Sequence, residues 1–233
     1  MGVSISTLVT DLDATSSRLR MDRMYRHQRH VYDLTRKFYL LGRDELLDAL
    51  PCAPGTAICE MGVGTGRNLI RLARRSSGTR LYGIDISSMM LATASTAIQR
   101  AGLGGRIRVV ESNIKNLDPL RHFAIERFDV VYFSYVLTML PDWRSAVTRA
   151  LDVLRPGGTL AVVDFADQTR ASALRRRILL TWLALFDVYP RSEIETALLA
   201  LARSLDPGFR HRSVARGYAY ELLFRKLTSA GTS

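Results

Sequence analysis

The chain has 233 residues, which is long enough for one α/β domain with a substantial core and short for two. Hydrophobic residues make up 47% and charged residues 24%, an ordinary globular balance that argues against disorder. The formal net charge is +11, and only three of the 33 basic residues are lysines. This excess of arginine predicts a polyanionic neighbour, nucleic acid or an anionic membrane surface, unless it reflects an arginine-biased genome.

Residues 1–20 are polar and rich in Ser and Thr, so we expect a loose leader without a secretory signal. The longest strongly apolar run, 178–186, is about half of the roughly 20 residues that a membrane-spanning helix needs. Cys52 and Cys59 have no metal-ligand spacing, which predicts reduced, buried thiols and no bound metal. We therefore expect a cytoplasmic protein that does not span a membrane but can lie on one.

Residues 21–50 have the pattern of two N-terminal helices. Tyr25, Tyr32 and Tyr39 recur every seven residues, beside a second stripe with the same period. Gly42 is a plausible stop for the first helix, and 43–50 reads as a second, short helix.

The remainder of the chain, to residue 233, alternates between predicted strands and helices. Strands are expected near 56–60, 80–85, 106–111, 128–134 and 159–165, and helices near 66–75, 88–101 and 142–154. A helical insert at 166–205 then precedes two candidate strands near 210–216 and 218–226, which could form an antiparallel hairpin. This order predicts a single α/β domain, 21–233, with a doubly wound and mostly parallel seven-stranded sheet.

A glycine-rich loop follows the first predicted strand. It carries one carboxylate and three glycines: Glu60, Gly62, Gly64 and Gly66. Asp85 closes the second strand, completing the shape of a nucleotide-binding βαβ unit. A dinucleotide fingerprint would have its third glycine at the position of Arg67. The observed spacing instead resembles the S-adenosylmethionine loop of class I methyltransferases, whose Rossmann-like fold it implies here.

That resemblance implies S-adenosylmethionine as cofactor and S-adenosylhomocysteine as product. Glu60 would accept hydrogen bonds from the amino-acid end of the cofactor, and Asp85 would take both ribose hydroxyls. Ile86 and Met89 or Met90 would pack on the adenine ring, whose amino group Asn113 would contact. The further expected cofactor contacts are Ile114, Ser134, Tyr25, Tyr32 and Arg36. The alternative is that these glycines merely make a tight turn.

The acceptor site is expected at the ends of the fourth and fifth strands. The stretch 133–137 lacks the Asn/Asp-Pro-Pro-Tyr motif of enzymes that methylate ring nitrogens, which argues against nucleobase or protein-glutamine acceptors. Tyr135 and Tyr32 are catalytic candidates because aromatic faces accommodate an amine that becomes cationic. Asp164 is a third candidate, orienting the amine or taking its proton through water. Simple packing for the tyrosines, and a loop cap for Asp164, are the alternatives.

Three segments, 21–44, 134–143 and 163–168, together resemble the diacylglyceryl-homoserine N-methyltransferases (BtaB-type) of bacterial betaine-lipid synthesis. The resemblance implies three successive methyl transfers to the homoserine amine of a membrane lipid, with the helices at 21–50 acting as a lid. Arg36 would then suit the carboxylate of the substrate.

A membrane lipid as substrate requires docking at the bilayer surface. The helix at 21–41 is rich in arginine, and Arg170, Arg175, Arg176 and Arg177 precede the apolar run in the insert. These Arg-rich helices predict peripheral association with the anionic inner face of the cytoplasmic membrane. The alternative for the insert is an ordinary helix packed on the sheet.

Three other functions remain open at the level of sequence. One is phosphatidylethanolamine N-methylation, and another is methylation of a soluble small-molecule amine. The last is a basic nucleic-acid-binding module, which would need stacking aromatics along a basic groove. We expect no nucleic-acid partner.

Overall fold

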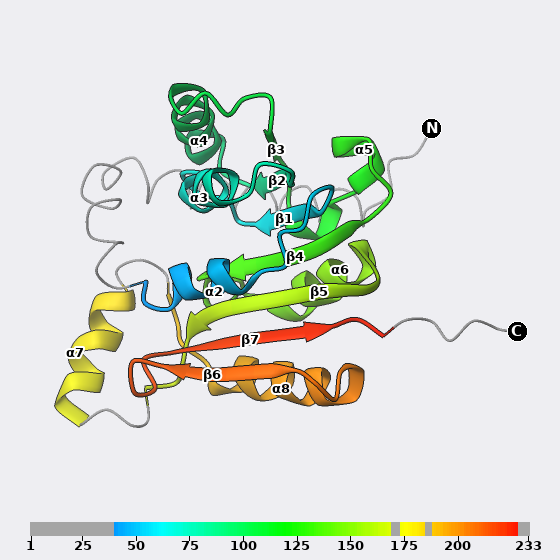
Figure 1. The fold of residues 1–233 in the computed structure, drawn as a ribbon. Coiled ribbons are helices and arrows are strands. Elements are labelled where there is room, and N and C mark those ends of the chain that lie inside the picture. Colours follow the sequence, from blue (N-terminus) through cyan, green and yellow to red (C-terminus); the bar gives the residue numbers. More distant parts are fainter. Residues whose placement is uncertain (1–39, 169–172, 185–187, 228–233) are drawn as a thin grey trace, which may run out of the picture.

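The computed structural model describes residues 40–168, 173–184 and 188–227, which form the coloured ribbon in Figure 1. The expected leader and almost all of the Tyr-bearing helix at 21–41 lie outside these ranges. The predictions for Tyr25, Tyr32 and Arg36 therefore stay predictions.

A seven-stranded sheet forms the centre of the structure, with the strand order β3-β2-β1-β4-β5-β7-β6. The strands are β1 Ala57–Met61, β2 Arg80–Asp85, β3 Ile107–Glu111, β4 Phe128–Ser134, β5 Leu154–Phe165, β6 Arg210–Val214 and β7 Ala219–Arg225. The first five are parallel, and β7 runs antiparallel to both β5 and β6. This confirms the predicted doubly wound sheet and its closing hairpin, with the order of the strands reversing between β1 and β4.

Helices cover both faces of the sheet (Figure 1). They are α2 Arg43–Ala49, α3 Arg67–Arg75, α4 Ser88–Arg100, α5 Pro119–Phe123, α6 Trp143–Val153, α7 Ala173–Ala184 and α8 Ser192–Leu205, with the 3₁₀ turns η1 Ile114–Asn116 and η2 Leu137–Met139. One face packs against α2, α3, α4 and α7, and the other against α5, α6 and α8. In the described part of the chain, no helix is both long enough and apolar enough to cross a bilayer.

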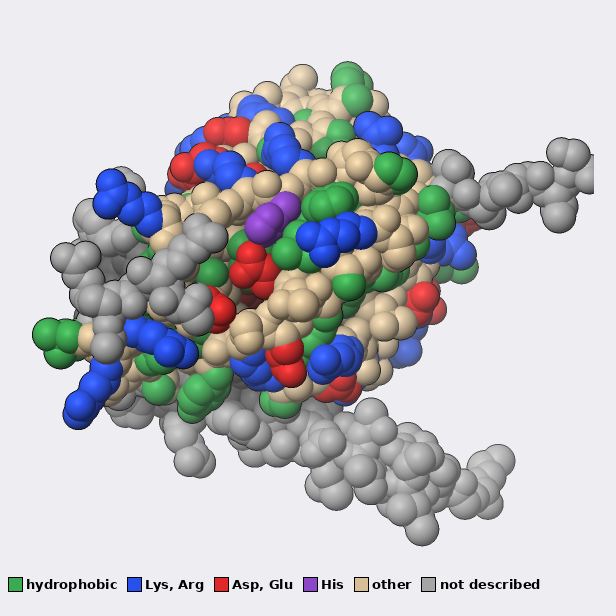
Figure 2. All heavy atoms as spheres, turned by 90° about the horizontal axis from the view of Figure 1, so that it is seen from below, with side chains coloured by type: hydrophobic (Ala, Val, Ile, Leu, Met, Phe, Trp, Pro, Cys, Tyr) green, Lys and Arg blue, Asp and Glu red, His purple; other side chains and the backbone are tan. Residues whose placement is uncertain are grey.

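The positive charge of the chain is divided among several surface patches. On the face shown in Figure 2, Lys and Arg side chains lie in separate groups with Asp and Glu side chains between them. Part of the charge is thus paired locally.

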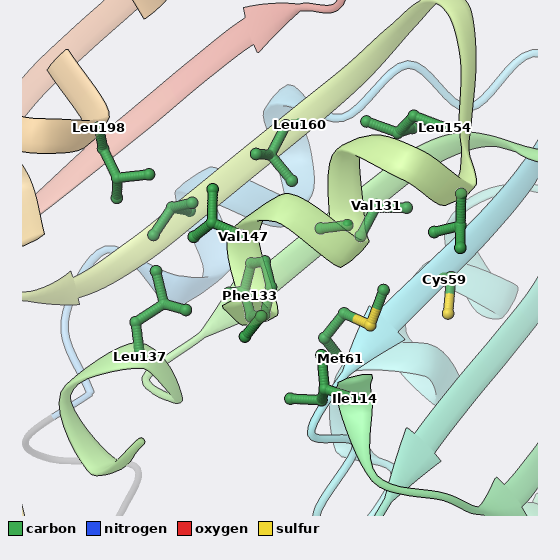
Figure 3. Packing of buried hydrophobic residues seen from close by; sticks show 14 of the residues in the cluster. Cys59, Met61, Ile114, Val131, Phe133, Leu137, Val147, Leu154, Leu160 and Leu198 are labelled. Carbon is green, nitrogen blue, oxygen red and sulfur yellow. The ribbon is translucent and has the colours of Figure 1, made fainter. Parts of the chain in front are cut away.

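Strand β4 contributes to both cores because successive side chains point to opposite faces. Val131 and Phe133 enter the core between the sheet and α6 and α8, and Figure 3 shows part of this core. Val130 and Tyr132 enter the core on the opposite face of the sheet. All four are at most 1% exposed. The unbroken apolar run therefore has the buried central position that its composition predicts.

Strand β5 begins earlier than expected. The sequence predicts a strand near 159–165, but α6 ends at Val153 and β5 starts at Leu154. Pairing with β4 skips from Leu154 to Thr159, so the residues between them bulge out of the ladder. Gly157, with φ 72°, donates its N–H to the Lys226 carbonyl at 2.9 Å. That hydrogen bond keeps the turn attached to the chain that follows β7.

Leu160 lies fully buried in the core beneath α6 and α8, which also contains Leu198 and Leu154 (Figure 3). We expect Leu160→Ala to lower the free energy of unfolding by about 2–5 kcal/mol, because it leaves a cavity between sheet and helices. Urea denaturation measures the change. Leu120, which is 64% exposed, is the matched control. Leu120→Ala should change stability by less than about 0.5 kcal/mol, and equal losses in both variants would contradict this assignment of the core.

Candidate functional site

The glycine loop turns sharply from β1 into α3. Gly62, Gly64 and Gly66 have φ values of 82°, 54° and 79°, a region that disfavours residues with a Cβ. A Cβ at Gly62 would also lie 2.7 Å from Cγ2 of Val136. The loop is therefore pressed against the end of β4, and only glycine fits the first of these positions without displacing its neighbour.

Asp85 holds this loop from the end of β2. Its Oδ2 accepts the N–H of Gly64 at 2.8 Å, and its Oδ1 accepts the N–H of Ser87 at 3.0 Å. A carboxylate offers about four acceptor positions, so one carboxyl group can accept from main-chain amides and from the hydroxyl groups of a ligand. Gly64 and Asp85 are 21 residues apart in the sequence, and their hydrogen bond joins the glycine loop to the end of β2. The two meet at one edge of the sheet, as the order of strands and loops in the sequence indicates.

Glu60 lies beneath the loop and is 1% exposed. Asn68 donates to its Oε1 at 2.6 Å, while Oε2 has no hydrogen-bond partner among the described residues. Burial raises the pKa of Glu60 from 4.5 to about 8, and favourable interactions with Asn68, Tyr132 and Arg43 offset this only in part. A buried carboxyl group with an open acceptor suits a ligand that brings a cationic donor.

The expected adenine side is built from the ends of β2 and β3. The N–H of Ser112 donates to the Asp85 carbonyl at 3.0 Å, which brings the turn after β3 next to Asp85. Ile86 is half-buried, and Met90 and Ile114 are buried.

The Oδ1 of Asn113 accepts the N–H of Lys115 at 3.0 Å and caps η1. The oxygen expected to meet an adenine amino group therefore already accepts one main-chain bond.

Tyr135 has contacts that the sequence did not indicate. It is 3% exposed with φ 60°, and its hydroxyl donates to the Leu41 carbonyl. Its ring packs edge-on against Phe165, 4.6 Å between centroids, and burial raises its pKa well above 10. Tyr135 thus ties β4 to the segment before α2, and a contact with the acceptor stays a prediction. The preceding residue, Ser134, has a buried Oγ with no partner in the described ranges.

Asp164 is completely buried at the end of β5. Its carboxylate accepts the hydroxyl and the N–H of Thr138, at 2.6 and 3.2 Å, and the N–H of Phe165 at 2.8 Å. Burial raises its pKa from 3.8 to about 6. These contacts favour the alternative of a loop cap, because Asp164 holds the η2 turn in place. Thr138, flanked by Leu137 and Met139, was missed, although a hydroxyl in an apolar turn is a signal for a buried partner.

Arg67 stands where a dinucleotide fingerprint would have glycine, and it has a structural role. It donates to both carboxylate oxygens of Asp44 at 2.6 and 3.0 Å, which lowers the pKa of Asp44. Arg71, one turn later, donates to Asp48 at 3.1 Å. These pairs join α3 to α2, and nothing in the local sequence pattern indicated them.

Comparison with known proteins agrees with this geometry. Residues 59–162 match the family model described as a methyltransferase domain. The trans-aconitate 2-methyltransferase of Deinococcus radiodurans is 33% identical over 128 residues, 55% of this chain and 45% of that protein. The ubiquinone/menaquinone biosynthesis C-methyltransferase UbiE of Vibrio vulnificus is 29% identical over 122 residues, 52% of this chain and 45% of that protein.

Solved structures share the fold. An O-methyltransferase family protein from Burkholderia thailandensis superposes with a TM-score of 0.62 at 21% identity, covering 81% of this chain and 55% of that one. The chain has the fold of class I methyltransferases. It spans about half the length of the curated relatives that it matches.

The cofactor of the methyltransferase domain is S-adenosylmethionine. The described residues fit it in two respects. The positive-φ Gly64 brings its backbone, without a side chain, against Asp85, and Glu60 offers a buried oxygen with no partner among the described residues to a cationic amine. Asp85 and Glu60 are the groups that would hold the ribose and the amino-acid end.

The raised pKa of Glu60 makes the stability of the methyltransferase domain depend on pH. Below 4.5 the carboxyl is protonated in both folded and unfolded chains, so its full contribution to stability is present. That contribution is lost as the pH rises through about 8. In this window the wild type should lose stability relative to Glu60→Gln with a slope approaching about 1.4 kcal/mol per pH unit. Urea denaturation at a series of pH values measures the difference.

Glu126→Gln, at an exposed position, provides the control and should keep the slope of the wild type. If Glu60→Gln showed that same slope, the assignment of a protonated Glu60 to the folded state would be wrong.

Proposed function

We propose that the chain transfers methyl groups from S-adenosylmethionine to an acceptor bound beside the ends of β4 and β5. The observation that carries this proposal is the Asp85 carboxylate, hydrogen-bonded to the amide of Gly64 in a loop of positive-φ glycines. The parallel strands end at this edge of the sheet, where doubly wound folds bind their ligands. The methyltransferase names of the relatives support the same reaction.

The residues of the chain contribute mainly by positioning, since an in-line transfer depends on the approach of two bound groups. When bound, the cofactor supplies the methyl group. Asp85 and the loop amides would hold the ribose, and Glu60 would accept hydrogen bonds from the cofactor beneath the loop. Asp164 keeps the η2 turn against the end of β5 through Thr138, which sets the wall next to the acceptor.

For the acceptor, we propose the amine of diacylglyceryl-homoserine, methylated three times to the betaine lipid. Two of the segments that resemble the BtaB-type enzymes, 134–143 and 163–168, are in contact through the Thr138–Asp164 hydrogen bond of 2.6 Å. Their juxtaposition supports the idea that they form one acceptor-side wall. Asp164 would hold this wall in place through Thr138, and the amine proton would leave to water.

A second candidate is C-methylation of a lipid quinone. It is favoured by relatives whose names specify quinone biosynthesis, among them the C-methyltransferase UbiE of Vibrio vulnificus. Both candidates use an acceptor that resides in a bilayer. Phosphatidylethanolamine and soluble acceptors, the latter represented by the trans-aconitate relative, are distinguished by the product.

Asp85→Ala tests the cofactor site. Loss of the carboxylate should weaken S-adenosylhomocysteine binding about 10- to 100-fold, because hydrogen bonds to a charged group are removed. Isothermal titration calorimetry measures the affinity. Asp152→Ala, at an exposed carboxylate on α6, should leave it unchanged. Unchanged affinity in Asp85→Ala, with a folded protein by circular dichroism, would contradict the site.

Lipid mass spectrometry tests the acceptor. Cells that make diacylglyceryl-homoserine and express the chain should accumulate its mono-, di- and trimethylated forms, and cells expressing Asp85→Ala should not. Methylated phosphatidylethanolamine or methylated quinone in place of these lipids would overturn the betaine-lipid proposal and identify the acceptor. Methylation of none of them, with intact cofactor binding, would favour a soluble acceptor.

A further inference from the structure

Helix α7 has an apolar residue on each of two opposite faces. Leu183 is completely buried and packs with Leu179 and Trp182 against the core shared with α2 and α3. Leu174 precedes Leu183 by nine residues, which at about 100° per residue places it on the opposite face. Leu174 is 69% exposed, and Ile178, on the same outer face, is 62% exposed. The inner face anchors the helix and the outer face presents large aliphatic side chains to the surroundings.

The described part of α7 carries only positive charge. Arg176 and Arg177 are both exposed, Arg177 beside Leu174 and Ile178 and Arg176 on the flank of the helix nearer to Leu183, and α7 contains no acidic residue. At the end of the molecule where α7 lies, Lys or Arg and hydrophobic side chains are neighbours on the surface in Figure 2. Among the described residues with large exposed hydrophobic side chains, Leu174, Ile178 and Tyr189 fall within one short stretch of the chain.

This surface is joined to the acceptor side of the sheet. The strand β4 points toward α7 (Figure 1). After the helix, the N–H of Val188 donates to the Leu183 carbonyl at 3.2 Å, and the N–H of Tyr189 donates to the Thr138 carbonyl at 3.4 Å. Thr138 in turn donates to Asp164. The half-exposed Tyr189 and the outer face of α7 therefore flank the edge of the sheet at which the acceptor is proposed to bind.

We propose that Leu174, Ile178, Arg176, Arg177 and Tyr189 form a docking surface for an anionic lipid bilayer. Aliphatic side chains would enter the boundary of the acyl chains while the arginines contact phosphate headgroups, the arrangement of helices that lie in an interface. A second copy of the chain fits less well, because a symmetric contact would bring the same arginines together. The proposal rests on the proposed function in one respect: a lipid acceptor explains why this surface adjoins the site.

Sedimentation with vesicles of phosphatidylcholine, alone or mixed with phosphatidylglycerol, tests the docking surface. The wild type should bind the mixed vesicles, and more weakly as salt is added. The double variant Leu174→Gln/Ile178→Gln should reduce partitioning at least about tenfold, since two aliphatic side chains no longer leave water. Arg176→Gln/Arg177→Gln should lower it about tenfold on the anionic vesicles and remove most of the salt dependence.

Leu120→Gln is the matched control, because Leu120 is as exposed as Ile178 but lies on α5 at the opposite end of the molecule. It should bind vesicles like the wild type. Unchanged vesicle binding by Leu174→Gln/Ile178→Gln would overturn the proposal. It would also be overturned if the wild type did not bind vesicles but formed a dimer by light scattering that this double variant lost. Vesicle binding by Asp85→Ala should equal that of the wild type. Docking and methyl transfer can therefore fail separately.

Discussion

The hydrogen bond from the Gly64 amide to Asp85 is the contact on which the site depends. It fixes the glycine loop against the end of the second strand and places a carboxylate beside the backbone of a residue that has no side chain. The loop also requires a residue without a Cβ in the strand on which it packs. A Cβ at Gly83, within β2, would lie 2.8 Å from Cγ2 of Val63, so the strand beneath the loop also needs a glycine. Glycine at both levels lets the loop pack closely on the strand beneath it.

The buried Glu60 shows that the loop is built at some cost to stability. Desolvation disfavours its charged form, and the hydrogen bond from Asn68 satisfies only one of its oxygens. A fold selected for stability alone would place an apolar residue there. The acid is more reasonably understood as part of the binding machinery, since strained or destabilised positions concentrate at functional sites.

The features of the structure that the sequence predicted correctly are those marked by a local or periodic pattern of residues. The apolar run of β4 and the spacing from the glycines to Asp85 are periodic or local signals, and they placed the strands and the loop correctly. The contacts that were missed join distant segments. Tyr135 and Leu41 are separated by 94 residues, Thr138 and Asp164 by 26, and Arg67 and Asp44 by 23. Such pairs are decided by how helices and turns pack on the sheet, which no local periodicity encodes.

Thr138 connects two features that are separate in the sequence. Its hydroxyl and amide hold Asp164 at the end of β5, and its carbonyl accepts the amide of Tyr189 after α7. One short turn is therefore shared by the acceptor side of the sheet and by the segment that carries the exposed apolar face. The segment after α7 is thereby linked to Asp164, since the amide of Tyr189 donates to Thr138 and Thr138 donates to Asp164. The helix insert is thus tied to the side of the sheet on which the acceptor is proposed to bind, while the glycine loop, on the other side of the switch between β1 and β4, forms the proposed cofactor site.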